Sequence, residues 1–598
     1  MNGGWIFDGN CFYRGVSSMK LSEALRVVHG ARETSTDAVE IYLAVGFMPL
    51  HLETLFQAHL IQCGDGKVVK IATGNYGDLW GNLERARDSS SRAVAVIIEW
   101  PDLDPRLGLR RLGGWSPEKL PDIVNNVNSA ARRLTLVLSE VSRSKPVALS
   151  LPTLPLPPVG YMASDQAGDF EFRLQESINQ IALNLVGERN CRIVNSQELD
   201  MRSPMTGRAD VKAELHAGFP YTIPHASTVA KLLARLIRPA QPKKGLITDL
   251  DDTFWDGIVG EVGIDGVSWS LERNSQMHGL YQQLLAALAD SGILIAVASK
   301  NDPAVVEQAF ERDDLLLSKN KVFPFEVNWG RKSESIKRIL SQWNIGPDAV
   351  VFIDDSPMEI AEVTAGHEQI ECHLFPKGDD EACYSLLQRL RDLFGKESIS
   401  EEDTLRRESL RQGQVVLMEA GDSAESLDAF LENLDAELEF EWNKSSPDPR
   451  VLELINKTNQ FNLNGDRVDQ GGWLRLLQEP DRFLLVVSYR DKFGPLGKIA
   501  ALSGTLSQNV LAVNTWVMSC RAFSRRIEYA CIRHLLERYD VDSVSFAYSR
   551  TVRNGPLQEF LREMLGAAPT GVVNLIRRDF DARCPRLVHS TKEIVLNG

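Results

Sequence analysis

The chain is poor in paired cysteines, long apolar runs and net positive charge, and each shortage excludes a class of protein. Its eight cysteines are scattered over 598 residues without a Cys-x-x-Cys pair, which argues against a structural zinc site and a disulfide framework. No apolar run approaches the roughly 18 residues that a membrane span requires. The formal net charge of −15 disfavours nucleic acid as a partner.

The first residues also lack the pattern of a secretory signal, because Met1 to Trp5 contain no charged region leading into an apolar one. We therefore expect a reduced, cytoplasmic protein that binds neither membranes nor nucleic acid. Hydrophobic residues make up 43% of the chain and charged residues 25%, as in ordinary globular proteins. A chain of this length is too long for one core, so three or four domains are expected.

One short apolar run ends abruptly in carboxylates. Gly245 to Thr248 has the composition of a parallel strand buried on both faces, and Asp249 and Asp251 follow it. Ligands of open α/β sheets bind outside the carboxyl ends of the strands, so both acids should lie near one spot at a sheet edge. Two acids held so close repel each other unless a cation lies between them.

Two further apolar runs end in polar groups. Ile293 to Ser299 ends in a hydroxyl, and Val350 to Ile353 is followed by Asp354 and Asp355, with Lys332 lying between the two runs. The order of acid, serine, lysine and paired acids resembles the four motifs of the haloacid dehalogenase (HAD) superfamily. The surrounding sequence, including Asp-Asp-Thr-Phe-Trp-Asp-Gly, Ser-Lys-Asn-Asp and Asn-Trp-x-x-Lys, is similar to its FkbH-like branch, the subfamily IIIC phosphatases.

The resemblance implies a multidomain α/β protein. We expect an SGNH-hydrolase-like α/β domain over residues 1–236 and a HAD-type Rossmannoid parallel sheet over 237–400. A charged linker over 401–424 and a GNAT-like α+β acyltransferase domain over 425–598 should follow. The HAD-like domain should lack a large cap, because a helix predicted from Met277 to Asp290 fills much of the chain between the first two motifs.

The first domain lacks the residues of a serine esterase. SGNH hydrolases place Gly-Asp-Ser after their first strand, whereas this chain has Gly46-Phe47-Met48-Pro49, with no hydroxyl to activate. We expect His216 and His225 to pack or cap rather than to catalyse. The segment from Glu99 to Arg106 is an unusual loop after a strand, and both a binding loop and a structured turn are compatible with it.

The residues of the motifs suggest roles in phosphoryl transfer. Asp249 is the expected nucleophile, since a carboxylate that attacks phosphorus forms an aspartyl phosphate and divides one hard step into two. Asp251 projects to the same face and is expected to carry the proton. Ser299 should donate a hydrogen bond to a phosphoryl oxygen, and Lys332 should stabilise the charge that develops in the transition state.

The same carboxylates predict a metal site. Mg²⁺ would be held by Asp249, by the backbone carbonyl of Asp251 and by Asp354 or Asp355, because it prefers carboxylates and water in an octahedral set. It would neutralise the repulsion between nucleophile and phosphate. The alternative is an acid-rich strand end that is only solvated.

Cys520 follows a predicted strand and precedes a predicted helix. A helix N-terminus at that position lowers the pKa of a thiol and favours a nucleophile that carries an acyl group. The alternative is a small buried residue that packs under the sheet, which is the commoner fate of cysteine. Both interpretations remain open. Nearby Arg525 and Arg526 would suit a phosphate or an acidic carrier protein.

Taken from the family, the implied function is a Mg²⁺-dependent phosphatase coupled to acyl transfer. Such an enzyme dephosphorylates an acyl phosphate, by family 1,3-bisphosphoglycerate, and loads the glyceryl unit onto an acyl carrier protein with a phosphopantetheine arm. The expected partners are therefore this carrier and a phosphorylated three-carbon substrate. Two alternatives stay open: a phosphomonoesterase of small molecules, and a carrier-binding scaffold with weak catalysis.

Overall fold

The computed structural model describes residues 18–595 except for 33–37, 65–67, 189, 398, 400–430, 443–447, 459, 480, 493, 508–509, 520–521, 524 and 552. The chain divides into two compact units, Met1–Ala240 and Gln241–Gly598, and each is described by itself. The linker predicted over 401–424 lies outside the described residues. None of the helices among the described residues combines the length and the apolar composition that a membrane span requires.

The first unit contains a five-stranded parallel sheet with strand order β2-β1-β3-β4-β5. Each parallel connection requires a crossover, and helices supply it. The strands are β1 (Ala38–Val45), β2 (Val68–Thr73), β3 (Ala93–Ile97), β4 (Val147–Ser150) and β5 (Cys191–Ile193). The helices are α1 (Leu21–Arg32), α2 (Leu50–Gln62), α3 (Leu79–Asp88), α4 (Trp100–Leu103), α5 (Leu120–Ser144), α6 (Asp169–Leu185), α7 (Ser196–Arg202), α8 (Val211–Ala217) and α9 (Ile223–Ile237).

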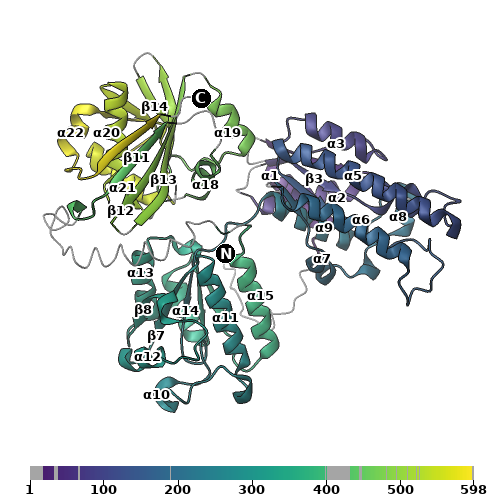
Figure 1. The fold of residues 1–598 in the computed structure, drawn as a ribbon, viewed down its shortest axis with the longest axis horizontal. Coiled ribbons are helices and arrows are strands. Elements are labelled where there is room, and N and C mark those ends of the chain that lie inside the picture. Colours follow the sequence, from purple (N-terminus) through teal and green to yellow (C-terminus); the bar gives the residue numbers. More distant parts are fainter. Residues whose placement is uncertain are drawn as a thin grey trace. The chain divides into compact units, whose positions relative to one another are not determined.

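Helices cover both faces of this sheet (Figure 1). Tyr42 and Ala44 of β1 pack with α3, α5 and α6 on one face. Ile41, Leu43 and Val45 pack with α1, α2 and α9 on the other face. Because successive side chains of a strand point to opposite faces, a strand buried on both faces is apolar along its length.

The second unit begins with another five-stranded parallel sheet, in the order β10-β9-β6-β7-β8. The strands are β6 (Gly245–Thr248), β7 (Leu294–Ser299), β8 (Val322–Val327), β9 (Val350–Asp354) and β10 (Glu371–Leu374). The helices are α10 (Val259–Val262), α11 (Gln276–Asp290), α12 (Pro303–Ala309), α13 (Lys332–Trp343), α14 (Pro357–Gly366) and α15 (Asp380–Phe394). The apolar runs expected to form β6, β7 and β9 do so.

Two hydrophobic clusters, one on each face, fix this sheet between its helices. Helices α11 and α15 pack together against one face, and α13 and α14 pack against the other (Figure 1). The helix predicted from Met277 to Asp290 is α11. Between Thr253 and Ser299 the structure has only the short α10, a single 3₁₀ turn and α11 as helices, so no large cap is inserted there.

The rest of the second unit is a seven-stranded mixed sheet in the order β16-β15-β14-β13-β12-β11-β17. Strands β11 to β14 pair antiparallel, and the β14–β15 and β11–β17 pairs are parallel. The strands are β11 (Glu437–Trp442), β12 (Arg482–Asp491), β13 (Gly494–Ser507), β14 (Val510–Met518), β15 (Ser543–Phe546), β16 (Val573–Ile576) and β17 (Ser590–Val595). The helices are α18 (Pro449–Lys457), α19 (Gln470–Leu477), α20 (Ile527–Tyr539), α21 (Gly555–Leu565) and α22 (Arg577–Arg583). The chain is therefore a multidomain α/β protein with two parallel sheets and one mixed sheet.

Candidate active site

The carboxyl ends of three neighbouring strands carry the motif residues. Strand β6 pairs with β7 on one side and with β9 on the other. Asp249 directly follows β6, Ser299 ends β7 and Asp354 ends β9. The backbone N–H of Asp249 donates to the carbonyl of Ile353 at 2.9 Å, which holds the first acid beside β9. The parallel arrangement thus brings the predicted residues to one edge.

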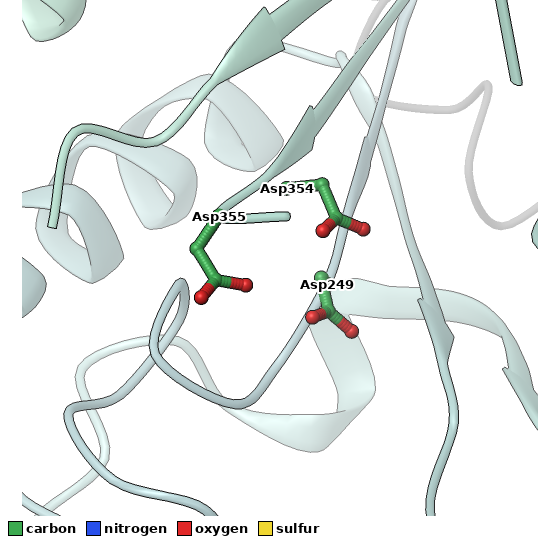
Figure 2. A group of neighbouring side chains, drawn as sticks. All are labelled: Asp249, Asp354 and Asp355. Carbon is green, nitrogen blue, oxygen red and sulfur yellow. The ribbon is translucent and has the colours of Figure 1, made fainter. Parts of the chain in front are cut away.

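Three carboxylates meet at this edge. One oxygen from each of Asp249, Asp354 and Asp355 lies within 4.8 Å of the other two, and Figure 2 shows the three side chains converging in front of the strand ends. Asp249 and Asp354 are buried, and Asp355 is partly exposed. Burial and the charge of Asp249 raise the pKa of Asp354 to about 7, and the same two causes raise the pKa of Asp355. Such a cluster favours a cation.

Lys332, the first residue of α13, supplies part of that positive charge. Its Nζ lies 3.0 Å from Asp249 Oδ1 and donates a hydrogen bond to Asp354 Oδ2. Burial opposes the charge on Lys332, but the two carboxylates outweigh it and raise its pKa. Lys332 contacts Asp249 and Asp354, so three carboxylates converge around one contacting ammonium group, and the cluster favours further positive charge. The donor set of carboxylate oxygens therefore fits a hard divalent cation such as Mg²⁺.

The side chain of Asp251 lies outside this cluster and is held by three donors. Trp255 Nε1 and the backbone N–H of Val259 donate to its Oδ1 at 2.9 and 3.1 Å. Asn301 Nδ2 donates to its Oδ2 at 3.0 Å and also to Ser299 Oγ at 3.1 Å. A carboxylate fixed in this way is suited to move a proton at a constant position. The sequence did not single out Asn301 or Trp255 for this role.

Replacing Asn301 tests this arrangement. If Asp251 has its expected role as proton carrier, Asn301→Ala should lower kcat about tenfold with little change in KM, because Asp251 loses one of the donors that hold it. Asn301→Asp should be worse, since it places a like charge beside Asp251. Steady-state kinetics across pH would check this, and an unchanged pH profile with unchanged kcat would assign Asn301 a packing role alone.

Ser299 lies where the motif order predicts, buried at the end of β7. Its Oγ accepts from Asn301, and no acceptor for its own hydroxyl proton is found in the described part of the chain. The hydroxyl group of Ser299 can therefore donate a hydrogen bond to a phosphoryl oxygen. This donor role stays a prediction.

The loop after the first motif is anchored rather than loose. Trp255 is fully buried and contacts Phe254 and Phe310 ring to ring. Asp252 has a positive φ of 54°, accepts a hydrogen bond from the Gly257 backbone at 2.9 Å and pairs with Lys377. These contacts fix the segment that carries the donors to Asp251.

Two other predicted features fall elsewhere in the chain. Cys520 lies outside the described residues, so its role remains a prediction. His225 is buried, with Thr153 Oγ1 and Ser203 Oγ each 2.9 Å from a ring nitrogen. Burial and the charge of Arg208 lower the pKa of His225 to about 3, and His216 is exposed in the last turn of α8. The burial and contacts of His225 agree with packing, and the role of His216 stays a prediction.

No protein-family model and no curated protein matches this chain. Among solved structures, it is similar to the N-terminal part of the protein BF1531 from Bacteroides fragilis, a crystal structure containing a phosphatase domain complexed with Mg. The match has a TM-score of 0.50 and 19% sequence identity, and covers 64% of this chain and all of the other. At that identity the likeness shows a shared fold.

Proposed function

We propose that this chain is a Mg²⁺-dependent phosphatase of the HAD type. The observation that carries the proposal is the cluster of Asp249, Asp354 and Asp355 with Lys332 at the carboxyl edge of a parallel sheet. The Mg-complexed phosphatase domain of the Bacteroides fragilis protein supports it, because the two chains share a fold. Asp249, Asp354 and Asp355 would hold the ion, together with the backbone carbonyl of Asp251.

The side chains divide the chemistry among them. An Asp249 oxygen attacks phosphorus, the bond from phosphorus to the leaving oxygen breaks, and an aspartyl phosphate forms. Asp251 gives a proton to the leaving oxygen and later takes one from the water that releases phosphate. Lys332 stabilises charge on the phosphoryl oxygens. Bound Mg²⁺ would neutralise the repulsion between carboxylate and phosphate.

At a finer level, we propose that the protein is an FkbH-like enzyme that couples this step to acyl transfer. The first domain would be SGNH-hydrolase-like and the last GNAT-like. The substrate would be 1,3-bisphosphoglycerate, and the acceptor a carrier protein with a phosphopantetheine thiol. What supports this is the sequence resemblance around the four motifs.

For the atoms to balance, the two phosphoryl groups of 1,3-bisphosphoglycerate must leave in different steps. Attack by Asp249 on the acyl phosphate would release a free carboxylate, which a thiol does not acylate without further activation. Asp249 must therefore act on the phosphomonoester. A thiolate then attacks the carbonyl carbon of the acyl phosphate, a thioester forms, and the C–O bond to phosphate breaks. Each turnover would release two phosphates and load one glyceryl unit.

Intact-mass analysis of the carrier tests the proposal. With wild-type enzyme, Mg²⁺ and 1,3-bisphosphoglycerate, the holo-carrier should gain one glyceryl unit. With Asp249→Asn it should retain the additional phosphoryl group or stay unloaded. Rapid hydrolysis of simple phosphomonoesters without carrier loading would favour the phosphomonoesterase alternative. Tight carrier binding without any turnover would favour the scaffold.

Cys520→Ala should separate the two activities. Phosphomonoester hydrolysis at Asp249 should persist within about twofold, because the HAD-like site is unchanged, whereas carrier loading should fail because the acyl group has no enzyme thiol to receive it. Wild-type enzyme without carrier should show an acyl adduct on the peptide that contains Cys520. If Cys520→Ala loads the carrier as fast as wild type, the residue is structural and transfer to the carrier thiol is direct.

A further inference from the structure

The first unit contains a cavity that the proposed function does not use. Its volume is about 380 Å³, within the range of small-molecule sites. Most of its wall is apolar or aromatic and includes Phe47, Trp100, Leu107 and the proline-rich segment 154–157. No serine, threonine or cysteine is among the described residues that line it, so this wall offers no hydroxyl or thiol nucleophile. We therefore consider the cavity as a binding site.

The cavity lies where open α/β sheets bind ligands. In the order β2-β1-β3-β4-β5, the chain runs from β1 to β2 on one side and then to β3 on the other side of β1. The switch point is therefore between β1 and β3, and ligands bind outside the carboxyl ends of strands at such a point. Gly46 follows β1, and Glu99 to Asp102 follow β3; all of them line the cavity.

Asp102 presents a carboxylate to the cavity. Its Oδ2 accepts the backbone N–H of Glu99 at 2.8 Å. Its Oδ1 lies against Gly46, where a Cβ would approach to 1.7 Å, so a glycine at that position makes room for the carboxylate. Burial, Glu99 and Glu214 raise the pKa of Asp102 to about 7. The described residues supply a donor to Oδ2 and none to Oδ1, so one oxygen of this carboxylate can accept from a ligand.

Glu214 of α8 provides a second acceptor. Its Oε1 lies 3.4 Å from Arg110 Nε, whereas its Oε2 is buried and has no hydrogen-bond partner among the described residues. An unsatisfied buried carboxylate oxygen is costly unless a donor arrives. Glu99, in contrast, is already satisfied by Thr153, Leu154 and Tyr221. Among the described residues, Asp102 Oδ1 and Glu214 Oε2 are therefore acceptors of this wall without a hydrogen-bond donor.

The charged residues that line the cavity indicate which kind of hydrogen-bond donor a ligand should carry. Glu99, Asp102, Asp210 and Glu214 line the cavity, and Arg110 is the only cation in its described wall. Arg110 is engaged by Tyr76 and by Glu214. Anionic ligands such as phosphates or carboxylic acids would meet these acidic side chains and a cation that is already engaged, whereas a cationic ligand favours the charged forms of the acids.

We propose that this cavity binds a small organic amine whose apolar body packs between Trp100, Leu107 and segment 154–157 and whose ammonium group donates to Asp102 and Glu214. The ammonium group supplies both a positive charge and the hydrogen-bond donors that the oxygens of Asp102 and Glu214 can accept. The apolar body is buried by the aromatic and proline-rich wall. A neutral alcohol would satisfy the donors without the charge, so it should bind more weakly.

Three matched probes test this on the full chain by ligand-observed NMR titration: benzylamine, benzyl alcohol and benzoate. Benzylamine should bind saturably and at least about tenfold more tightly than benzyl alcohol, and benzoate should not bind. Equal binding of benzoate and benzylamine, or no saturable binding of benzylamine, would overturn the proposal. This ranking is measured on the wild-type protein and depends on no variant.

Two variants test whether the ammonium group binds at Asp102 and Glu214. Asp102→Asn and Glu214→Gln should each weaken benzylamine about tenfold and leave benzyl alcohol within about twofold. Glu118→Gln, an exposed acid of the same unit that does not line the cavity, is the matched control and should bind all probes like wild type. Wild-type affinity for benzylamine in both folded acid variants, checked by circular dichroism, would contradict the site.

Discussion

Asp249→Asn should abolish phosphate release, lowering turnover by at least about 10³-fold while the protein stays folded. The amide has nearly the shape of the carboxylate but is no nucleophile for phosphorus. Because the substitution also removes one of the two charges that Lys332 contacts, the fold should be confirmed by thermal melting. Continuous measurement of released phosphate checks the prediction.

Asp265→Asn is the matched control for this substitution. Asp265 is an exposed acid of the same parallel-sheet domain and should retain wild-type turnover. If Asp249→Asn turns over within severalfold of wild type, Asp249 is not the nucleophile. Another carboxylate of the cluster would then have to be the nucleophile. The assignment of Asp249 to the first of the four motifs would be wrong.

Removal of Mg²⁺ should have the second largest effect. Exhaustive chelation is expected to lower phosphate release at least about 100-fold, and added Mg²⁺ should restore it, because three converging carboxylates and one lysine leave uncompensated negative charge. Saturating Mg²⁺ should also raise the Tm by about 5 °C. This thermal readout is independent of turnover.

Asp354→Asn should remove most of that Mg²⁺-dependent shift, and Asp265→Asn should retain it. Since the pKa of Asp354 is raised to about 7, a proton competes with the ion below that pH, so the affinity for Mg²⁺ should fall as the solution is acidified. Full activity after chelation, or an equal shift in Asp354→Asn, would contradict the metal site.

The positions of the strand-end acids can be predicted from the sequence alone. Asp249, Asp354 and Asp355 follow short apolar runs, and parallel strands present their carboxyl ends at one edge. Periodicity likewise located α11 to within one residue. The family assignment and the substrate, by contrast, rest on resemblance and stay predictions.

What the sequence did not provide depends on contacts between distant segments. The role of Asn301 requires its side chain to reach from the end of β7 to Asp251, which no spacing rule encodes. The cavity of the first unit depends on Gly46 leaving room for Asp102, whereas the sequence of that segment predicts only a binding loop or a structured turn. Both features are set by tertiary packing rather than by local pattern.

Direct detection of the phosphorylated residue tests the central claim best. Wild-type enzyme is mixed with substrate and Mg²⁺, quenched in acid within the first turnover, digested and analysed by mass spectrometry. One phosphoryl group should be found on Asp249, absent from Asp249→Asn and from enzyme treated with chelator. Phosphoryl transfer to any other residue, or turnover with no phosphorylated Asp249 at the earliest times, would contradict the account.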